Sequence, residues 1–106
     1  AESVGLIEAH GTGTRAGDQA EFAGLQMAFN TQTSSVKKYC ALGSIKSQIG
    51  HTKSAAGSAG LFKAAMALHH KLLPPTIKID EPNPDLDFNH SPFYLNTQLR
   101  PWFHQE

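Results

Sequence analysis

Short apolar runs and longer stretches with helical spacing alternate along the chain. Apolar residues dominate positions 4–9 and 39–44, and a third run lies within 92–102. Runs of this length, bounded by glycine, proline and polar residues, predict short buried strands. In 18–30 and 54–72 the apolar residues recur every three or four positions, which predicts two helices. Because the predicted strands and helices alternate along the chain, the pattern predicts an α/β fold with a layered sheet.

The first predicted helix has a start signal and one apolar face. We expect Asp18 to cap its N-terminus, because Glu21 follows three residues later with the spacing of a capping box. The helix is expected to run to about Asn30. The residues predicted to face the core are Phe22, Leu25, Met27 and Phe29, with Ala20 and Ala23 filling in.

The second predicted helix carries little side-chain bulk. Its small residues are Ala55, Ala56, Gly57, Ala59, Gly60, Ala64, Ala65 and Ala67. Two glycines inside a helix cost about 1 kcal/mol each relative to alanine, a cost that is tolerable where another segment must come very close. We therefore expect this helix to be buried at the centre of the layers. Its N-terminus should lie just after His51, and Pro74 and Pro75 should end it.

Three connections complete the predicted order of elements. Residues 30–38 are polar and predict a surface connection. Residues 45–52 are expected to form a loop, and residues 76–91 are proline-marked and predicted to be mostly extended.

Composition narrows the class of protein. The 106 residues suffice for one small domain, and 40% of them are apolar. Nine basic and nine acidic side chains cancel, which argues against nucleic acid or an anionic membrane surface as a partner. Cys40 is the single cysteine, so no internal disulfide can form. With neither a signal-peptide pattern nor a long apolar run, we expect a cytoplasmic protein with no membrane partner.

The ends of the sequence resemble interruptions within a larger domain. A strand pattern is already under way at Val4, and another strand-like run ends just before the last residues. We therefore expect residues 1–106 to be an excerpt, truncated at both ends. The isolated chain is expected to be marginally stable or insoluble.

The segment EAHGTGTRAGDQAE, residues 8–21, admits three chemical interpretations. A phosphate loop is disfavoured, because the segment lacks both the Lys-Ser/Thr of a P-loop and the full GxGxxG spacing. A metal site is disfavoured, because His10, Asp18 and Glu21 do not have ligand spacing. We assign Asp18 and Glu21 mainly to capping and loop stabilisation. The third interpretation is the setting of a catalytic histidine, and its structural alternative is that His10 caps a strand and only satisfies a hydrogen bond.

His51 changes the interpretation of His10. Both histidines follow a short apolar strand and a glycine-bearing loop and precede a helix, so the two loops should meet at one sheet edge. Two neutral imidazoles could there donate Nε2–H bonds to a carbonyl oxygen that gains charge, near a helix N-terminus. Lys46, five residues before His51, could bias their protonation and orient the loop.

The motifs HGTGT and KxxxGH, in this order, resemble the C-terminal half of a β-ketoacyl synthase. The resemblance covers nearly the whole chain and implies a thiolase-like layered α/β/α/β/α fold, of which this is the C-terminal half only. The GTGT and GDxxE forms are similar to ketosynthases of modular polyketide synthases and polyunsaturated fatty acid synthases. The run KSQIGHTKS, with Gln48, looks closest to the polyunsaturated fatty acid synthase type.

This resemblance implies a role for each site residue. By motif match, His10 and His51 are the catalytic histidines that bind the thioester carbonyl of a malonyl extender, and Lys46 is the family lysine. Thr12 and Thr14 match threonines that contact the phosphopantetheine arm. The implied partners are an acyl carrier protein and acyl and malonyl thioesters, with the full domain a homodimer. No metal or directly bound cofactor is implied, because substrates travel on the carrier's phosphopantetheine.

Departures from the family pattern qualify these roles. The family's nucleophilic cysteine lies in a separate upstream motif, and we interpret Cys40 as a buried core thiol. This chain alone should therefore not catalyse condensation. Gly60 stands nine residues after His51, where some stand-alone synthases carry a glutamate that pairs with the lysine, so the role of Lys46 stays open. The alternatives are a chain-length factor, a decarboxylating partner, or a non-catalytic module that docks carrier proteins.

The remaining histidines and the C-terminal aromatic residues receive structural interpretations. His69 and His70 end the second helix, where a cation complements the helix dipole. His90 and His104 lie in loop or terminal sequence. Trp102 and Phe103 are expected to pack against parts of the larger domain.

Overall fold

A parallel sheet forms the middle of the molecule. The computed structural model describes residues 2–29 and 38–103. Within them, β1 (Leu6–Glu8), β2 (Cys40–Gly43) and β4 (Phe93–Leu95) form a three-stranded sheet in the order β1-β2-β4. Both strand pairs are parallel. The central strand β2 is buried along its whole length, as expected for a parallel strand covered on both faces.

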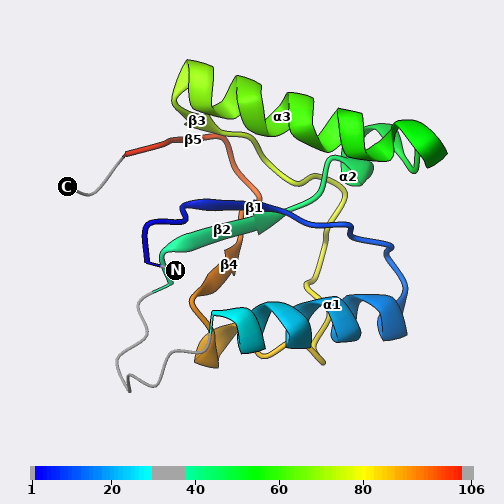
Figure 1. Cartoon of the computed structure of the whole chain (residues 1–106). Coiled ribbons are helices and arrows are strands. Elements are labelled where there is room, and N and C mark those ends of the chain that lie inside the picture. The colour runs from blue at the N-terminus through cyan, green and yellow to red at the C-terminus, as the bar shows by residue number, and fades with distance from the viewer. Residues whose placement is uncertain (1, 30–37, 104–106) are drawn as a thin grey trace.

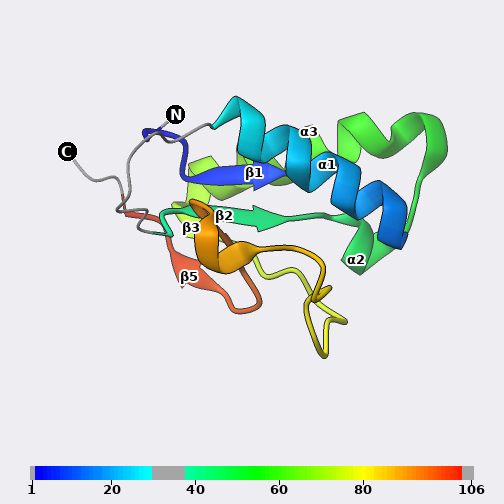
Figure 2. The same ribbon diagram turned by 90° about the horizontal axis from the view of Figure 1, so that it is seen from below.

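Two long helices cover the sheet from opposite sides. Helix α1 (Arg15–Ala28) lies below it and α3 (Ala56–His70) above it in Figure 1, and the view from below in Figure 2 places α1 in front of the strands. The predicted α/β layering is therefore present.

Shorter elements complete the fold. A single-turn helix α2 (Lys46–Ile49) and a 3₁₀ turn η1 (Lys53–Ala55) precede α3, and a second 3₁₀ turn, η2 (Phe88–His90), precedes β4. Strands β3 (Leu72–Leu73) and β5 (Arg100–Pro101) form a small antiparallel pair.

Aromatic packing holds α1 on the sheet. The core cluster consists of Phe22, Cys40, Leu42 and Phe93. The Phe93 ring meets Phe22 and Phe29 edge-on, with centroid distances of 5.8 and 5.1 Å. Such pairs contribute beyond the area they bury. The position of α1, and of the loop that leads into it, therefore depends on Phe93.

The N-terminus of α1 differs from the prediction. Helix α1 begins at Arg15, and Thr14 is its N-cap, with extended backbone and a hydroxyl that accepts from the N–H of Gly17. Asp18 lies within the first turn and accepts instead from Gly13 N–H. The prediction of Asp18 as the cap was wrong, because Thr14 satisfies the helix's free N–H groups four residues earlier.

The apolar face of α1 is narrower than predicted. Phe22, Leu25 and Phe29 face the core, but Met27 is 79% exposed. Five residues after Phe22, a helix has turned to a direction about 140° away, so Met27 cannot share that face. Ala20 and Ala23 are exposed as well. The predicted end at Asn30 and most of the predicted 30–38 connection lie outside the described residues.

Helix α3 spans Ala56–His70, within the predicted 54–72, and differs from the prediction in how it ends. It ends at His70, where Lys71 takes the left-handed conformation, before Pro74 is reached. The predicted 45–52 loop contains α2, and 72–73 form β3 rather than helix. Leu61, Phe62 and Leu68 are exposed, so α3 covers the sheet with one side only in this chain.

The last predicted strand is divided in two by Asn96. This side chain is buried and donates to the carbonyl oxygens of Leu73 and Pro74. The chain therefore turns after β4 and pairs β5 with β3. Trp102 then lies against Gly5 and donates its backbone N–H to the carbonyl oxygen of Lys71, and its side chain is half-buried within this chain. Its expected packing against other parts of a larger domain stays a prediction. Phe103 is 80% exposed.

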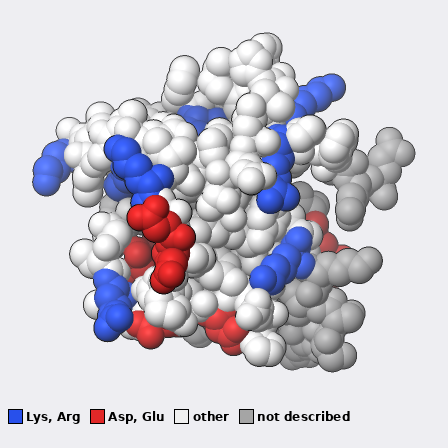
Figure 3. Space-filling view, turned by 180° about the vertical axis from the view of Figure 1, so that it is seen from behind, with Lys and Arg blue, Asp and Glu red and all other residues white. Residues whose placement is uncertain are grey.

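The surface carries charges of both signs. On the face shown in Figure 3, basic and acidic side chains lie close together, and neither sign dominates. No helix among the described residues is long and apolar enough to cross a membrane.

Candidate active site

His10 and His51 meet at one edge of the sheet. Their ring centroids are 5.7 Å apart and their planes are nearly perpendicular, although 41 residues separate them in the sequence. His10 follows β1, and His51 follows the loop and short helix after β2. Because β1 and β2 are parallel neighbours, the segments that leave their carboxyl ends are brought to the same edge. The predicted meeting of the two histidine loops is present in the fold.

The tautomer of His51 follows from its backbone neighbour. Its Nδ1 lies 3.0 Å from the N–H of Lys53, in the position of an acceptor. A neutral imidazole that accepts at Nδ1 carries its proton on Nε2. Partial desolvation, with the charges of Lys46, Lys53 and His10, lowers the pKa of His51 below its ordinary value of 6.5. At neutral pH His51 is therefore an uncharged Nε2–H donor.

The loop of His10 is held by backbone bonds to α1. The N–H groups of His10 and Gly11 donate to the two carboxylate oxygens of Glu21, at 2.6 and 2.9 Å. Gly11 has a φ of +57°, and a Cβ there would lie 2.7 Å from the Ser44 side chain. Only glycine meets both conditions without strain. Glu21 and Asp18 stabilise the loop, as the sequence predicted.

Lys46 connects the two histidine loops. Its ammonium donates to the backbone carbonyl of His10, while its own N–H donates to Ser44 Oγ at 3.3 Å. Lys46 thus fixes the distance between the loop after β1 and the turn after β2, and its charge lowers the pKa of His51.

A groove of about 850 Å³ opens beside this pair. Thr12, Lys46 and His51 are among the residues that line it. His10 lines a smaller hollow of about 300 Å³ against α3, and Lys46 lines both hollows. Thr14 lines neither, because its hydroxyl caps α1 and lies 3.0 Å from Thr12 Oγ1. Among the described residues, no group of three or more histidine, cysteine or acidic side chains could hold a metal ion.

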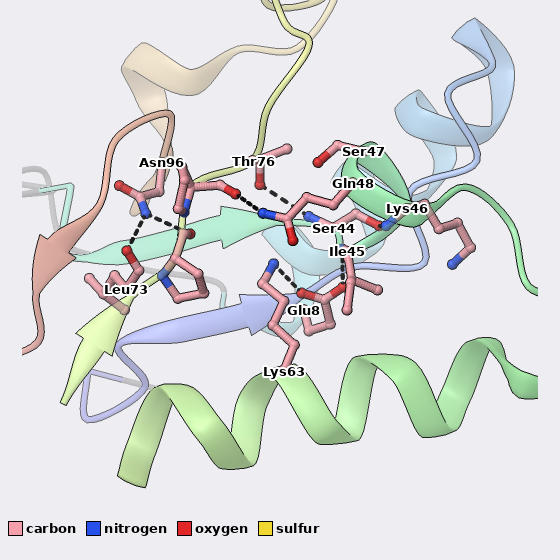
Figure 4. Close-up of polar contacts among 12 residues, drawn as sticks. Glu8, Ser44, Ile45, Lys46, Ser47, Gln48, Lys63, Leu73, Thr76 and Asn96 are labelled. Carbon is pink, nitrogen blue, oxygen red and sulfur yellow. Dashed lines mark hydrogen bonds and ion pairs between the residues drawn. The ribbon is translucent and has the colours of Figure 1, made fainter. Parts of the chain in front are cut away.

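A buried ion pair beneath the site was not predicted. Lys63, in α3, is 6% exposed, and its Nζ lies 2.6 Å from Glu8 Oε2 (Figure 4). The other Glu8 oxygen accepts the N–H of Ile45. Each member had a signal of its own in the sequence, a lone lysine within the apolar run of α3 and a glutamate at the end of an apolar strand, but neither signal identified its partner.

Gly60 leaves room for the Glu8 side chain. A Cβ at Gly60 would lie 3.1 Å from Glu8 Cγ, and Glu8 cannot easily yield because both carboxylate oxygens are engaged. We expect Gly60→Ala to bring no gain in stability, whereas Gly24→Ala, at an open position in α1, gains about 1 kcal/mol. Thermal melts of the two variants compare them directly. An equal gain for both would contradict the proposed crowding.

Cys40 is a core thiol, as predicted. It is fully buried in β2, and burial raises its pKa to about 11. The thiolate is the reactive form, so alkylation by iodoacetamide at pH 8 is expected to be slow in the folded protein and fast in denaturant. Mass spectrometry of the two reactions provides the measurement. Rapid modification of the folded protein would contradict the assignment.

Known proteins are similar to this chain in sequence and in fold. The family described as "Beta-ketoacyl synthase, C-terminal domain" matches residues 1–80. The chain is 48% identical to polyketide synthase PksL of Bacillus subtilis over 95% of its length, and 47% identical to a polyunsaturated fatty acid synthase of Thraustochytrium sp. over 95%. It spans 2% and 4% of these two relatives.

A solved structure gives the same result for the fold. The ketosynthase from module 6 of the bacillaene synthase of Bacillus subtilis 168 superimposes with a TM-score of 0.92 at 46% identity. The match covers 99% of this chain and 19% of that chain. The predicted thiolase-like α/β fold is confirmed, and the chain covers only part of such a domain. Both synthase types that the motifs resemble are among the relatives. The chain therefore belongs to the β-ketoacyl synthase C-terminal domain family.

Proposed function

We propose that this chain forms the C-terminal part of a ketosynthase domain that joins a malonyl extender to an acyl chain by decarboxylative condensation. The observation that carries the proposal is the juxtaposition of His10 and His51, with the Nε2–H of His51 free to donate. Loss of CO2 from a malonyl thioester places negative charge on the thioester oxygen. Donors fixed at that oxygen lower the barrier to its formation.

The proposed reaction has a decarboxylation step and a condensation step. The malonyl C–C bond breaks and releases CO2, and its electron pair forms the enolate whose oxygen accepts bonds from His10 and His51. The enolate carbon attacks an acyl thioester on the enzyme, forming a C–C bond and expelling the thiolate, which takes up a proton. The product is a β-ketoacyl thioester, so the enzyme is an acyltransferase of the β-ketoacyl-carrier-protein synthase type.

The other site residues have supporting roles in this proposal. Lys46 holds the His10 loop, and its charge adds to the partial desolvation that lowers the pKa of His51. Thr12 lines the groove in which a phosphopantetheine arm would lie, and Thr14 positions Thr12 through their hydroxyl contact. The acyl and malonyl groups would arrive on an acyl carrier protein, and no further cofactor is required.

The nucleophile is assigned to another part of the same domain. Cys40 is buried and its raised pKa disfavours the thiolate, so it does not suit acyl transfer. We propose that the upstream part of the domain supplies a reactive cysteine and that the complete domain is a homodimer. The 106 residues alone are expected to be inactive in condensation.

Product analysis of the complete ketosynthase tests this function. With an acyl donor and malonyl-carrier protein, we expect one CO2 for each β-ketoacyl-carrier product, measured by mass spectrometry and ¹⁴CO2 release. Release of CO2 without the ketoacyl product would instead indicate a decarboxylating partner. Carrier binding without either product would indicate a docking module.

A further inference from the structure

The buried carboxylate of Glu8 joins three segments of the site. Glu8 lies in β1, two residues before His10. One oxygen accepts the N–H of Ile45, the residue before Lys46, and the other lies 2.6 Å from Lys63 Nζ on α3 (Figure 4). The strand before His10, the turn that carries Lys46 and helix α3 are therefore all fixed to one side chain.

Stability alone gives no reason for a charged pair at this position. The side chains of Glu8 and Lys63 are 14% and 5% exposed. Well-packed apolar residues of similar volume are often as stabilising as a buried ion pair, because two charges must be removed from water. An apolar pair could not, however, accept the N–H of Ile45. The carboxylate is thus matched to a hydrogen bond that orients the α2 turn.

The surroundings of Glu8 limit its movement. The absence of a side chain at Gly60 lets α3 approach the aliphatic part of Glu8, with 3.1 Å between Glu8 Cγ and an added Cβ. On the other side of the turn, the N–H of Ser44 donates to the buried Thr76 hydroxyl at 3.3 Å. The turn that carries Lys46 is held from both sides, by Glu8 and by Thr76.

We propose that Glu8 is a positioning residue for the two histidines, and that the contact with Lys63 holds its carboxylate in place. By accepting the Ile45 N–H, Glu8 fixes the turn that carries Lys46. This turn places the Lys46 ammonium on the His10 carbonyl. The contact in turn sets how closely the His51 loop approaches His10. The expected effect of Glu8 on catalysis rests on the proposed function. The expected effect of Glu8 on the two imidazoles does not depend on that function.

Two double variants of the complete ketosynthase separate positioning from folding. E8Q/K63M removes both charges and keeps an oxygen that can accept the Ile45 N–H, whereas E8L/K63M removes the acceptor as well. We expect E8Q/K63M to retain most of the wild-type decarboxylation rate. For E8L/K63M we expect kcat to fall about 10- to 100-fold with little change in KM, because small displacements of catalytic groups cost this much.

A second pair of variants removes the donor instead of the acceptor. Ile45 has a φ of −61°, which suits proline, so Ile45→Pro deletes the N–H without removing the charge of Glu8 or Lys63. Ile45→Ala, which keeps the N–H, controls for loss of the side chain. The expected loss of kcat is larger for Ile45→Pro than for Ile45→Ala, even if E8L/K63M does not fold.

Imidazole NMR distinguishes failure of this proposal from failure of the proposed function. Titration of His51 should show the wild-type pKa in E8Q/K63M and a shifted pKa in E8L/K63M or Ile45→Pro. Wild-type protein without decarboxylation would refute the proposed function, while the NMR comparison would still test positioning. An unchanged His51 pKa and an unchanged kcat in folded E8L/K63M, or in Ile45→Pro, would overturn the role of Glu8.

Discussion

His51→Ala should lower the rate of malonyl-carrier decarboxylation by about 10²–10³-fold, the usual effect of removing one donor from a developing oxyanion. In the structure His51 accepts a backbone N–H at Nδ1, so its Nε2–H is directed to other partners. The loss should appear mainly in kcat, because the bond to the oxygen strengthens as charge develops.

The matched control is His69→Ala. His69 is exposed near the end of α3 and its ring contacts His70, away from the His10–His51 pair. Decarboxylation should stay within about twofold of wild type, as for most surface substitutions far from a site. Equal rates in His51→Ala and wild type would show that the His51 imidazole does not take part in the chemistry.

Phe93→Ala should destabilise the protein by about 3–5 kcal/mol, the range for truncating a buried phenylalanine. Phe93 is fully buried in β4 and contacts the rings of Phe22 and Phe29. Its removal leaves a cavity between the sheet and α1. Since α1 also carries Glu21, which holds the His10 loop, loss of the core should loosen the site.

Denaturant unfolding of Phe93→Ala and Phe103→Ala provides the comparison. Phe103 is 80% exposed, so the same truncation there should change the free energy of unfolding by less than about 0.5 kcal/mol. An equal loss of stability in the two variants would contradict the assignment of Phe93 to the core.

Local sequence patterns predicted the elements better than their ends. The apolar runs located β1, β2 and β4, because strands of a covered parallel sheet consist mainly of apolar residues in sequence. Thr14 and Asp18 are both competent caps, four residues apart, and sequence alone could not decide which one takes the extended backbone. Met27 was misplaced for a related reason, since its direction depends on where the helix meets the sheet.

The candidate site was predictable where topology alone determines it. Parallel neighbours bring the segments after β1 and β2 together, so His10 and His51 could be paired from their similar settings. The Glu8–Lys63 pair could not be found this way, because 55 residues separate its members and each is common in other roles. The cap role of Thr14 likewise depends on a backbone conformation that the motif GTGT does not specify.

A structure of the complete ketosynthase with a stable malonyl thioester analogue, its thioester sulfur replaced by a methylene, tests the central claim most directly. Hydrogen bonds between imidazole nitrogen and carbonyl oxygen span about 2.7–3.2 Å. We predict that the carbonyl oxygen lies within this distance of Nε2 of both His10 and His51. A bound analogue whose carbonyl oxygen contacts neither histidine would contradict the account.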